Sequence, residues 1–497
     1  MGFAVLKDGV KPAAIDRSAL VDRALRVCRG LQDLGLRKGT VVVLLGEPSV
    51  PWAVTFAAVL LAGGMPVPIH ARSTPAEFER VMAVSRAKFA VVSVLSSAFT
   101  ADEQDRDWTT VPMERAGGGH PSIEAMFELD RAVPAACDED EPAVVLPTSG
   151  TTGDPKLVVH THRSHMEFLD GWTDRLMTGD DKVLGFLPLN HQGGLLIAWI
   201  AAFYLGIPYY HLSQFSVREF WDAVHTYQIT WTGLIDPVPG YLLDAEPTDG
   251  DRAHSLRMVI GSRRPSQIPA MERRFGIRLM RSYGSTETTH VAMSVELNRP
   301  EVAGLTLEEF AACAGPPLPG WSFRIIQEDR AEAPPGVTGS LEVRGPWLFA
   351  YYLNNPEATA AAFTEDGWFK TGDRAYVNRH RELFFVERAG NSIRRNGENI
   401  SAAEVESVLL EHPGISQVCV VGVPDARRGQ EVRACVVRSP GSTVTADEIF
   451  DHCLASLSKF KVPRYIDFWD EFPRTSTFKI ARRELGSDPD TWVDRYA

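Results

Sequence analysis

A segment rich in glycine and hydroxyl side chains follows a short apolar stretch, residues 143–146, in the first third of the chain. It reads Thr148-Ser149-Gly150-Thr151-Thr152-Gly153-Asp154-Pro155-Lys156. Small residues leave backbone N–H groups accessible to the oxygens of a polyphosphate, and the lysine adds a compact positive charge. The spacing differs from the phosphate loop GxxxxGK followed by Ser or Thr, so a surface turn is the alternative interpretation.

Four further polar segments follow in order along the chain. They are RSYGSTET at 281–288, GWFKTGD at 367–373, NGENIS at 396–401 with Arg388 before it, and PRTSTFKI at 473–480. In this order and at these separations, the five segments resemble the adenylate-forming superfamily of acyl-CoA synthetases, free-standing adenylation domains and luciferases. The resemblance extends over essentially the whole chain. Five ordered motifs are more specific than one, because a single short motif often matches by chance.

The resemblance implies a reaction in two steps. A carboxylate attacks the α-phosphorus of ATP and expels pyrophosphate, and a thiol then captures the acyl-AMP. Because charge gathers on phosphoryl oxygens, preorganised donors and a metal ion suit this chemistry, and ATP, Mg²⁺ and coenzyme A are expected. The residues that the resemblance places at ATP or AMP are Thr148, Ser149, Gly150, Thr151, Thr152, Gly153, Lys156, Gly261, Ser262, Tyr283, Gly284, Ser285, Asp373 and Arg388.

The same resemblance implies individual roles. Lys479 would lie between the acyl carboxylate and the α-phosphate, Thr286 would meet the α-phosphate, and Glu287 would hold Mg²⁺. Tyr283 would stack on adenine, and Asp373 would accept hydrogen bonds from the ribose hydroxyls. Taken one at a time, these residues also fit ordinary roles, such as a helix cap, a turn acid, a core aromatic or a surface lysine.

The resemblance also places His191, Asp236 and Gly397 beside the acyl group and the pantetheine arm. For His191, in LPLNHQGGL, a packed core histidine is the alternative. Asp236 precedes Pro237, which is also the pattern of an ordinary helix N-terminus. If the Asp236 carboxylate were instead buried in the pocket, it would select an acid that bears an amine or a hydroxyl group.

Three histidines, His160, His162 and His165, are close in sequence. No nearby cysteine or carboxylate completes a tetrahedral set, and the Thr161-His162 pair is common in the resembling family. Glu287 is therefore the one metal ligand that we predict.

Four positions depart from the family pattern, namely Leu157, Asn391, Asn396 and Phe478. Phe478 stands where a glycine usually precedes the catalytic lysine, and a phenyl group there would redirect the lysine loop or fill part of the acyl pocket. A tolerated loop substitution is the other interpretation. The departures at Phe478 and Asn391 motivate a separate hypothesis, a nucleotide-binding protein with little ligase activity.

The expected acceptor is coenzyme A. Residues 396–406 are similar to the version found in CoA ligases, and no carrier domain follows them in this sequence. A free-standing adenylation enzyme that loads an acid or amino acid onto the phosphopantetheine of a carrier protein is the alternative. We expect the acid to be cyclic, aromatic or medium-sized, as in secondary metabolism.

Apolar patterns around these motifs indicate an α/β fold. Helical spacing covers 19–34, 52–62, 402–411 and 446–456. Strand patterns cover 40–45, 90–95, 323–326, 339–343, 383–386, 418–423 and 432–437. We predict a large N-terminal domain, residues 1–390, with two helix-flanked β-sheets and a small β-barrel-like unit. A small, mobile α+β C-terminal domain, residues 391–497, follows.

The composition indicates which classes of binding partner the protein is expected to have. The chain has 497 residues, with 64 acidic and 51 basic side chains. The resulting net charge of −13 disfavours binding to nucleic acid, whose phosphates are also negative. The apolar stretches 51–69 and 183–210 are interrupted by prolines and polar residues, so membrane insertion is not expected. Six scattered cysteines without a CxxC pair indicate reduced thiols and a cytoplasmic protein. The oligomeric state stays open, with a homodimer as one option.

Overall fold

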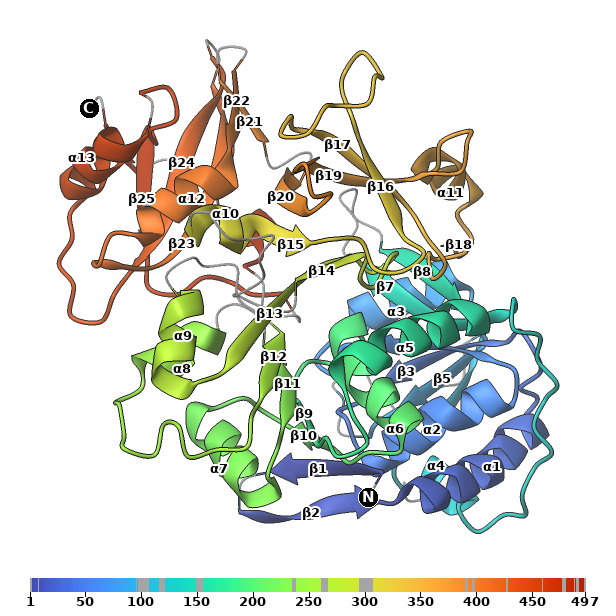
Figure 1. Cartoon of the computed structure of the whole chain (residues 1–497). Helices are drawn as coiled ribbons and strands as arrows, with labels where there is room; N and C mark the ends of the chain where they lie inside the picture. Colours follow the sequence, from blue (N-terminus) through green and yellow to red (C-terminus); the bar gives the residue numbers. More distant parts are fainter. Residues whose placement is uncertain are drawn as a thin grey trace.

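The computed structural model has the expected mixed α/β architecture, with a large N-terminal domain and a smaller C-terminal domain (Figure 1). The residues it describes are 2–7, 9–94, 96, 107–115, 121–148, 155–234, 238–260, 267–294, 307–388, 392–395, 398–425, 428–457, 459–475, 480–486, 488 and 491–495.

The largest sheet has eight strands. Their order is β14 (Ala292–Ser294), β13 (Arg278–Tyr283), β12 (Met258–Ile260), β11 (Trp231–Gly233), β9 (Val183–Gly185), β10 (Tyr209–Leu212), β1 (Phe3–Lys7) and β2 (Val10–Ile15). The strands between β13 and β1 are parallel, and the two edge strands run antiparallel. The helices in this part of the chain are the π-helix η1 (Gly193–Ile200), α6 (Ala201–Leu205), α7 (Val217–Tyr227), α8 (Val238–Asp244) and α9 (Gln267–Phe275).

A second, parallel sheet has the order β4 (Met65–Ile69), β3 (Val41–Leu45), β5 (Phe89–Val92) and β6 (Thr109–Pro112). Its helices are α1 (Arg17–Asp33), α2 (Val50–Leu61), α3 (Pro75–Ser85) and α4 (Ile123–Met126). The α2 and η1 helices pack together through Trp52 and Trp199, whose rings are 5.7 Å apart, and Phe3 of β1 lies 5.5 Å from Trp199. One hydrophobic core therefore joins the two sheets.

Two antiparallel sheets complete the N-terminal domain. A three-stranded sheet has the order β18 (Tyr351–Tyr352), β8 (Lys156–Thr161) and β7 (Pro142–Thr148), followed by α5 (His162–Leu176). The small β-barrel-like unit that we expect corresponds to a five-stranded sheet in the order β15 (Cys313–Gly315), β20 (Leu383–Arg388), β19 (Phe369–Val377), β17 (Gly339–Arg344) and β16 (Ser322–Ile326). The helices near it in sequence are α10 (Leu307–Ala312) and α11 (Pro356–Ala362).

The C-terminal domain has its own core. Its sheet runs β22 (Glu398–Ser401), β21 (Ser392–Arg395), β24 (Gly429–Arg438), β25 (Tyr465–Trp469) and β26 (Val493–Asp494), and β23 (Ile415–Asp425) also pairs with β24. The helices are α12 (Ala402–Leu410), α13 (Ala446–Ser456) and the 3₁₀ turn η3 (Arg482–Glu484). Strand β20 ends at Arg388 and β21 begins at Ser392, so a boundary between 390 and 391 stays a prediction.

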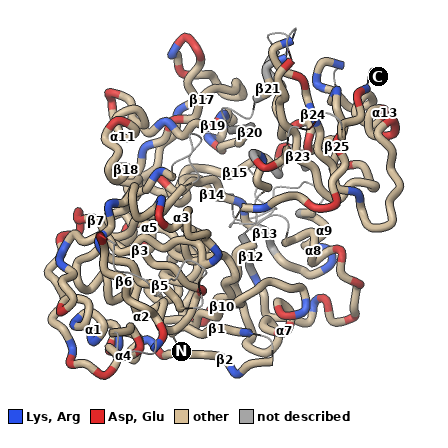
Figure 2. Tube along the Cα trace, turned by 180° about the vertical axis from the view of Figure 1, so that it is seen from behind, with Lys and Arg blue, Asp and Glu red and all other residues tan. Residues whose placement is uncertain are grey.

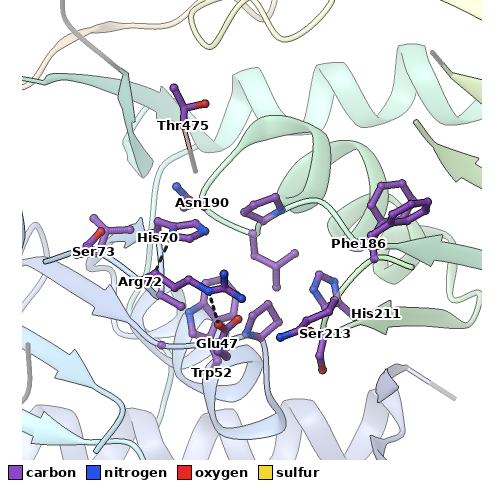
Figure 3. A pocket seen from close by; sticks show the side chains of 18 of the residues that line it. Glu47, Trp52, His70, Arg72, Ser73, Phe186, Asn190, His211, Ser213 and Thr475 are labelled. Carbon is purple, nitrogen blue, oxygen red and sulfur yellow. Dashed lines mark hydrogen bonds and ion pairs between the residues drawn. The ribbon is translucent and has the colours of Figure 1, made fainter. Parts of the chain in front are cut away.

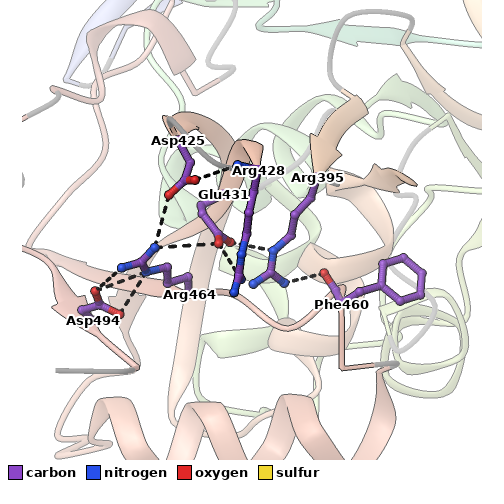
Figure 4. Close-up of polar contacts among 7 residues, drawn as sticks. All are labelled: Arg395, Asp425, Arg428, Glu431, Phe460, Arg464 and Asp494. Carbon is purple, nitrogen blue, oxygen red and sulfur yellow. Dashed lines mark hydrogen bonds and ion pairs between the residues drawn. The ribbon is translucent and has the colours of Figure 1, made fainter. Parts of the chain in front are cut away.

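Three arginines surround the buried carboxylate of Glu431 in the C-terminal domain. Glu431 lies between Arg395, at 2.7 Å, and Arg428, at 2.8 Å, and Arg464 approaches it at 3.8 Å (Figure 4). The Arg395 guanidinium also donates to the Phe460 carbonyl at 2.7 Å. These contacts tie β21 and β24 to the segment before β25.

Local sequence explains where many helices begin. Thr74 and Glu77 form a capping box at α3, and Thr445 and Glu448 form another at α13. Each pair satisfies backbone N–H groups that the first helical turn leaves without partners. At α2 the Ser49 side chain caps the helix in the same way, with a proline in the first turn.

The apolar stretch at 51–69 forms most of α2 and all of β4. The stretch at 183–210 forms β9, η1, α6 and the start of β10. In the part of the chain that is described, no helix combines the length and hydropathy that a bilayer crossing requires. Acidic and basic residues are interspersed over the trace (Figure 2).

Candidate active site

The glycine-rich segment connects two antiparallel strands. Strands β7 and β8 pair with Thr148 opposite Lys156, and the Thr148 hydroxyl donates to the Lys156 carbonyl at 3.3 Å. The Lys156 ammonium lies 4.7 Å from the centre of the Tyr352 ring, which is a cation–π contact. The expected phosphate ligands that lie outside the described residues are Ser149, Gly150, Thr151, Thr152 and Gly153.

Tyr283 and Asp373, both expected at the nucleotide, are in contact although 90 positions separate them. The Tyr283 hydroxyl donates to Asp373 Oδ2 at 2.5 Å, and both side chains are buried. Phe385 stacks on the Tyr283 ring with 6.0 Å between the ring centres. Arg388 is opposite Asp373 in the β19–β20 register, but its side chain lies outside the described part.

The loop after β13 has a backbone that few residues allow. A Cβ atom on Gly284 would lie 1.7 Å from the Thr289 carbonyl oxygen, so glycine is required there. Thr289 has φ of +55°, which is rare for a β-branched residue. The Ser285 N–H donates to the Thr288 hydroxyl at 2.9 Å. This tight turn carries Glu287, and strained backbone of this kind is concentrated at functional sites.

Glu287 is 8% exposed and held at two points. Its Oε1 accepts a hydrogen bond from the Tyr352 hydroxyl at 2.9 Å, and its backbone carbonyl accepts one from the Phe349 N–H at 2.8 Å. Among the described residues, no protein group donates to Oε2. A carboxylate oxygen is the kind of ligand that Mg²⁺ prefers, so Glu287 fits the expected metal role.

Two buried residues that are not among the predicted site residues meet at the Thr286 carbonyl. His160 Nε2 lies 2.8 Å from this oxygen, and Gln192 Nε2 lies 3.4 Å from it. Burial lowers the pKa of His160 to about 4, so its ring is neutral. In the sequence, His160 stands out only as a polar residue directly after the apolar residues 157–159. Gln192 is marked only by its position beside His191.

His191 lies where η1 begins. Its Nδ1 accepts a hydrogen bond from the Gly193 N–H at 3.1 Å, and its carbonyl accepts one from the Leu195 N–H at 2.9 Å. The remaining expected site residues lie outside the described residues, and their roles stay predictions; they are Asp236, Gly261, Ser262, Gly397 and Lys479.

A cavity of about 810 Å³ lies where the eight-stranded sheet, the four-stranded sheet and the C-terminal domain meet (Figure 3). Its walls come from residues 46–48, 52, 69–73, 77, 186, 188–190, 211 and 213–215 of the N-terminal domain, and from Arg474, Thr475 and Glu484 of the C-terminal domain. His211 lines this cavity, with its Nδ1 2.9 Å from the Tyr209 hydroxyl. Burial lowers the pKa of His211 to about 3, so it presents a neutral imidazole.

The fold and the gathered residues define an AMP-binding enzyme. Residues 12–353 match the family described as AMP-binding enzyme, and residues 404–479 match the AMP-binding enzyme C-terminal domain. The chain belongs to the AMP-binding enzyme family.

Similar curated proteins are CoA ligases. The chain is 30% identical over 469 residues to the crotonobetaine/carnitine–CoA ligase of Salmonella arizonae, covering 91% of this chain and 89% of that protein. It is 31% identical over 476 residues to the oxalate–CoA ligase of Arabidopsis thaliana, covering 93% and 91%.

Solved structures with the same fold contain nucleotides. The ATP-bound MatB of Rhodopseudomonas palustris is 26% identical, with a TM-score of 0.83 and coverage of 97% of this chain and 94% of MatB. The o-succinylbenzoate CoA synthetase of Bacillus subtilis, in complex with its acyl-adenylate intermediate, is 26% identical, with a TM-score of 0.81 and coverage of 94% and 92%. The same synthetase in complex with ATP and magnesium ion has a TM-score of 0.79 at 26% identity, with coverage of 94% and 93%.

Proposed function

We propose that this protein is an AMP-forming acid–thiol ligase that uses ATP and Mg²⁺ to convert a carboxylic acid to acyl-AMP and then to an acyl-CoA. The observation that carries the proposal is a pair of contacts between predicted site residues. Tyr352 joins Lys156 to Glu287, and Tyr283 is hydrogen-bonded to Asp373. The CoA ligase activities of the curated relatives support the same reaction.

In the first step, a carboxylate oxygen of the acid bonds to the α-phosphorus, the bond to the α,β-bridging oxygen breaks, and pyrophosphate leaves. Lys156 supplies positive charge to the outer phosphates, and Glu287 would hold Mg²⁺, which would neutralise phosphate charge. Tyr283 packs against adenine, and Asp373 accepts from the ribose. Lys479 stabilises charge between the carboxylate and the α-phosphate.

In the second step, the thiol sulfur of coenzyme A attacks the acyl carbonyl carbon, loses its proton and displaces AMP. The similarity of residues 396–406 to CoA ligases supports coenzyme A as the acceptor, with Gly397 and His191 beside the pantetheine arm. The polar and aromatic lining of the cavity beside segment 186–190 suits an acid or thiol arm with hydrogen-bonding groups. Reduced cysteines support a cytoplasmic location.

Acid-dependent ATP–pyrophosphate exchange tests the first step. A panel of aliphatic, aromatic, polycyclic, dicarboxylic, betaine and β-amino acids is assayed with wild type, Lys479→Ala and the exposed control Lys459→Ala. We expect exchange with at least one acid, loss of exchange in Lys479→Ala, and retention in Lys459→Ala. Equal exchange in all three proteins would remove Lys479 from the mechanism.

The acceptor is tested with the acid that gives exchange. Free coenzyme A and a phosphopantetheinylated carrier protein are offered separately, and the thioester product is identified by mass. Thioester with coenzyme A is the expected result. Product with the carrier protein alone would replace the ligase assignment with a free-standing adenylation enzyme. ATP binding without exchange on any acid would favour a nucleotide-binding protein.

A further inference from the structure

A histidine and a glutamine from separate segments lie behind the loop that carries Glu287. His160 is on β8, four residues after Lys156, and Gln192 directly follows His191. Both side chains are buried, and their Nε2 atoms lie 2.9 Å from each other and 2.8 Å and 3.4 Å from the Thr286 carbonyl oxygen. Three segments that are distant in sequence therefore meet at one oxygen atom.

The chemistry of this contact sets the direction of each hydrogen bond. A backbone carbonyl oxygen only accepts, and its two lone pairs can receive two donors. His160 therefore donates from Nε2, so this nitrogen cannot also accept from the Gln192 amide 2.9 Å away. The Gln192 amide nitrogen donates to the same carbonyl oxygen over the longer distance of 3.4 Å. The His165 ring stacks on His160 with 5.1 Å between the ring centres and 27° between the planes, which restricts rotation of the imidazole.

Holding this carbonyl also orients the other side of the same peptide. In a planar trans peptide, the carbonyl of Thr286 and the N–H of Glu287 point in opposite directions. No protein acceptor for the Glu287 N–H occurs among the residues that are described. The Glu287 carboxylate and carbonyl are held separately, by Tyr352 and Phe349.

We propose that His160 and Gln192 are positioning residues, which hold the Thr286–Glu287 peptide so that the Glu287 N–H and carboxylate face the phosphates and metal ion of bound nucleotide. The inference rests on the proposed function, because it concerns the same nucleotide site. Neither side chain touches substrate: each acts through the backbone of the loop. Because Gln192 adjoins His191, the segment that borders the expected acyl pocket also contacts the loop that carries Glu287.

Nucleotide binding tests this inference without knowledge of the acid. The probe is α,β-methylene-ATP, which cannot release pyrophosphate, and its affinity is measured by titration calorimetry with Mg²⁺ and again with a chelator. The variants are His160→Leu and Gln192→Leu, which remove the donors, and His160→Gln, whose amide nitrogen can reach the position of the imidazole Nε2. His254→Leu is the matched control, because His254 Nε2 also contacts a backbone carbonyl, that of Phe275, at 2.9 Å.

We expect the factor by which Mg²⁺ tightens binding to fall roughly tenfold in His160→Leu, and by less in Gln192→Leu, which has the longer contact. His160→Gln should recover most of this factor, and His254→Leu should leave it unchanged. The unfolding temperature of each variant is measured in parallel. A general loss of stability would lower affinity with and without Mg²⁺ alike, whereas a positioning role changes the ratio.

The outcomes separate this inference from the proposed function. Binding to wild type with an unchanged Mg²⁺ factor in both leucine variants would overturn the positioning role and leave the ligase assignment intact. Equal losses in His160→Leu and His160→Gln would also overturn it, because a donor at that place would then be irrelevant. Absence of nucleotide binding to wild type would reject the proposed function and this inference together.

Discussion

The hydrogen bond between Tyr283 and Asp373 joins two residues that sequence reasoning assigns to different parts of one nucleotide. The contact is 2.5 Å long and is accepted by Asp373 Oδ2. Hydrogen bonds to a charged group contribute more than neutral ones, about 1.5–3 kcal/mol. The tyrosine thus fixes the carboxylate for which we predict a contact with the ribose.

At the residue scale, Asp373→Asn should weaken AMP binding roughly tenfold, because an amide has one acceptor oxygen instead of two and carries no charge. Calorimetric titration with AMP measures the change. Asp366→Asn, an exposed acid that pairs with Arg324 at 2.8 Å, makes the same chemical change away from the site and should leave AMP affinity intact. Equal affinities for wild type and Asp373→Asn would contradict the ribose assignment.

The loop between β13 and β14 shows how an element positions a metal ligand. Its conformation depends on the close approach of Gly284 to Thr289 and on the left-handed φ at Thr289. The turn brings Glu287 beside Tyr352, 65 positions later in the chain. The geometry of the carboxylate therefore depends on backbone packing as much as on the glutamate itself.

At the element scale, Gly284→Ala should destabilise the fold by about 3 kcal/mol and abolish nucleotide binding, because the added methyl group overlaps a backbone carbonyl. Thermal unfolding and AMP titration measure the two effects. Gly179→Ala is the control, since a Cβ atom there meets nothing within 4 Å. An alanine variant at 284 that melts and binds like wild type would show that the loop has another conformation.

At the scale of the whole molecule, the two domains differ in the charge state of their buried titratable side chains. In the N-terminal domain, burial lowers the pKa of His160, His165 and His211, and these rings are neutral in the folded protein. In the C-terminal domain, Glu431 is fully buried against Arg395, which is 4% exposed. Acid should therefore destabilise the first domain through its histidines.

The pH dependence has a definite sign. A histidine with pKa near 6.5 when unfolded and about 3 when folded binds its proton only in the unfolded chain between these values. Stability is thus fully present above pH 6.5 and declines as the pH falls. His211→Phe should reduce the loss between pH 7 and pH 5 by about 2 kcal/mol.

Urea unfolding at the two pH values measures this difference. Tyr209→Phe is the control, because it removes the hydrogen bond to His211 and keeps the titrating ring. The assignment fails if His211→Phe and wild type lose the same stability on acidification.

We expect the ion pairs around Glu431 to stabilise the C-terminal domain. Glu431→Gln should destabilise that domain by about 3–5 kcal/mol, because Arg395 is left buried without a counter-charge. Glu404→Gln, which breaks the more exposed pair with Lys461, should cost less than about 1 kcal/mol. Differential scanning calorimetry of the full chain follows both variants. A smaller loss in Glu431→Gln than in Glu404→Gln would show that the buried cluster is not stabilising.

Much of the fold and several site residues follow from the sequence alone. The helix expected at 446–456 has exactly those bounds as α13, and the strand expected at 339–343 is β17 with one further residue. Caps and apolar periods act between residues at most a few positions apart, so they can be read without the fold. The ordered motifs likewise indicated the family, because each motif lies within one short segment.

The tertiary structure alone determined which of those residues act together. His160 and Thr286 are 126 positions apart, Gln192 and Thr286 are 94 apart, and Tyr352 lies 65 positions after Glu287. The sequence around His160 does not indicate the contact with Thr286, and no local pattern marks Gln192 or Tyr352, because these roles depend on which strands and loops pack against one another. Local sequence determines where helices and strands form, whereas contacts between distant segments depend on the packing of the whole core.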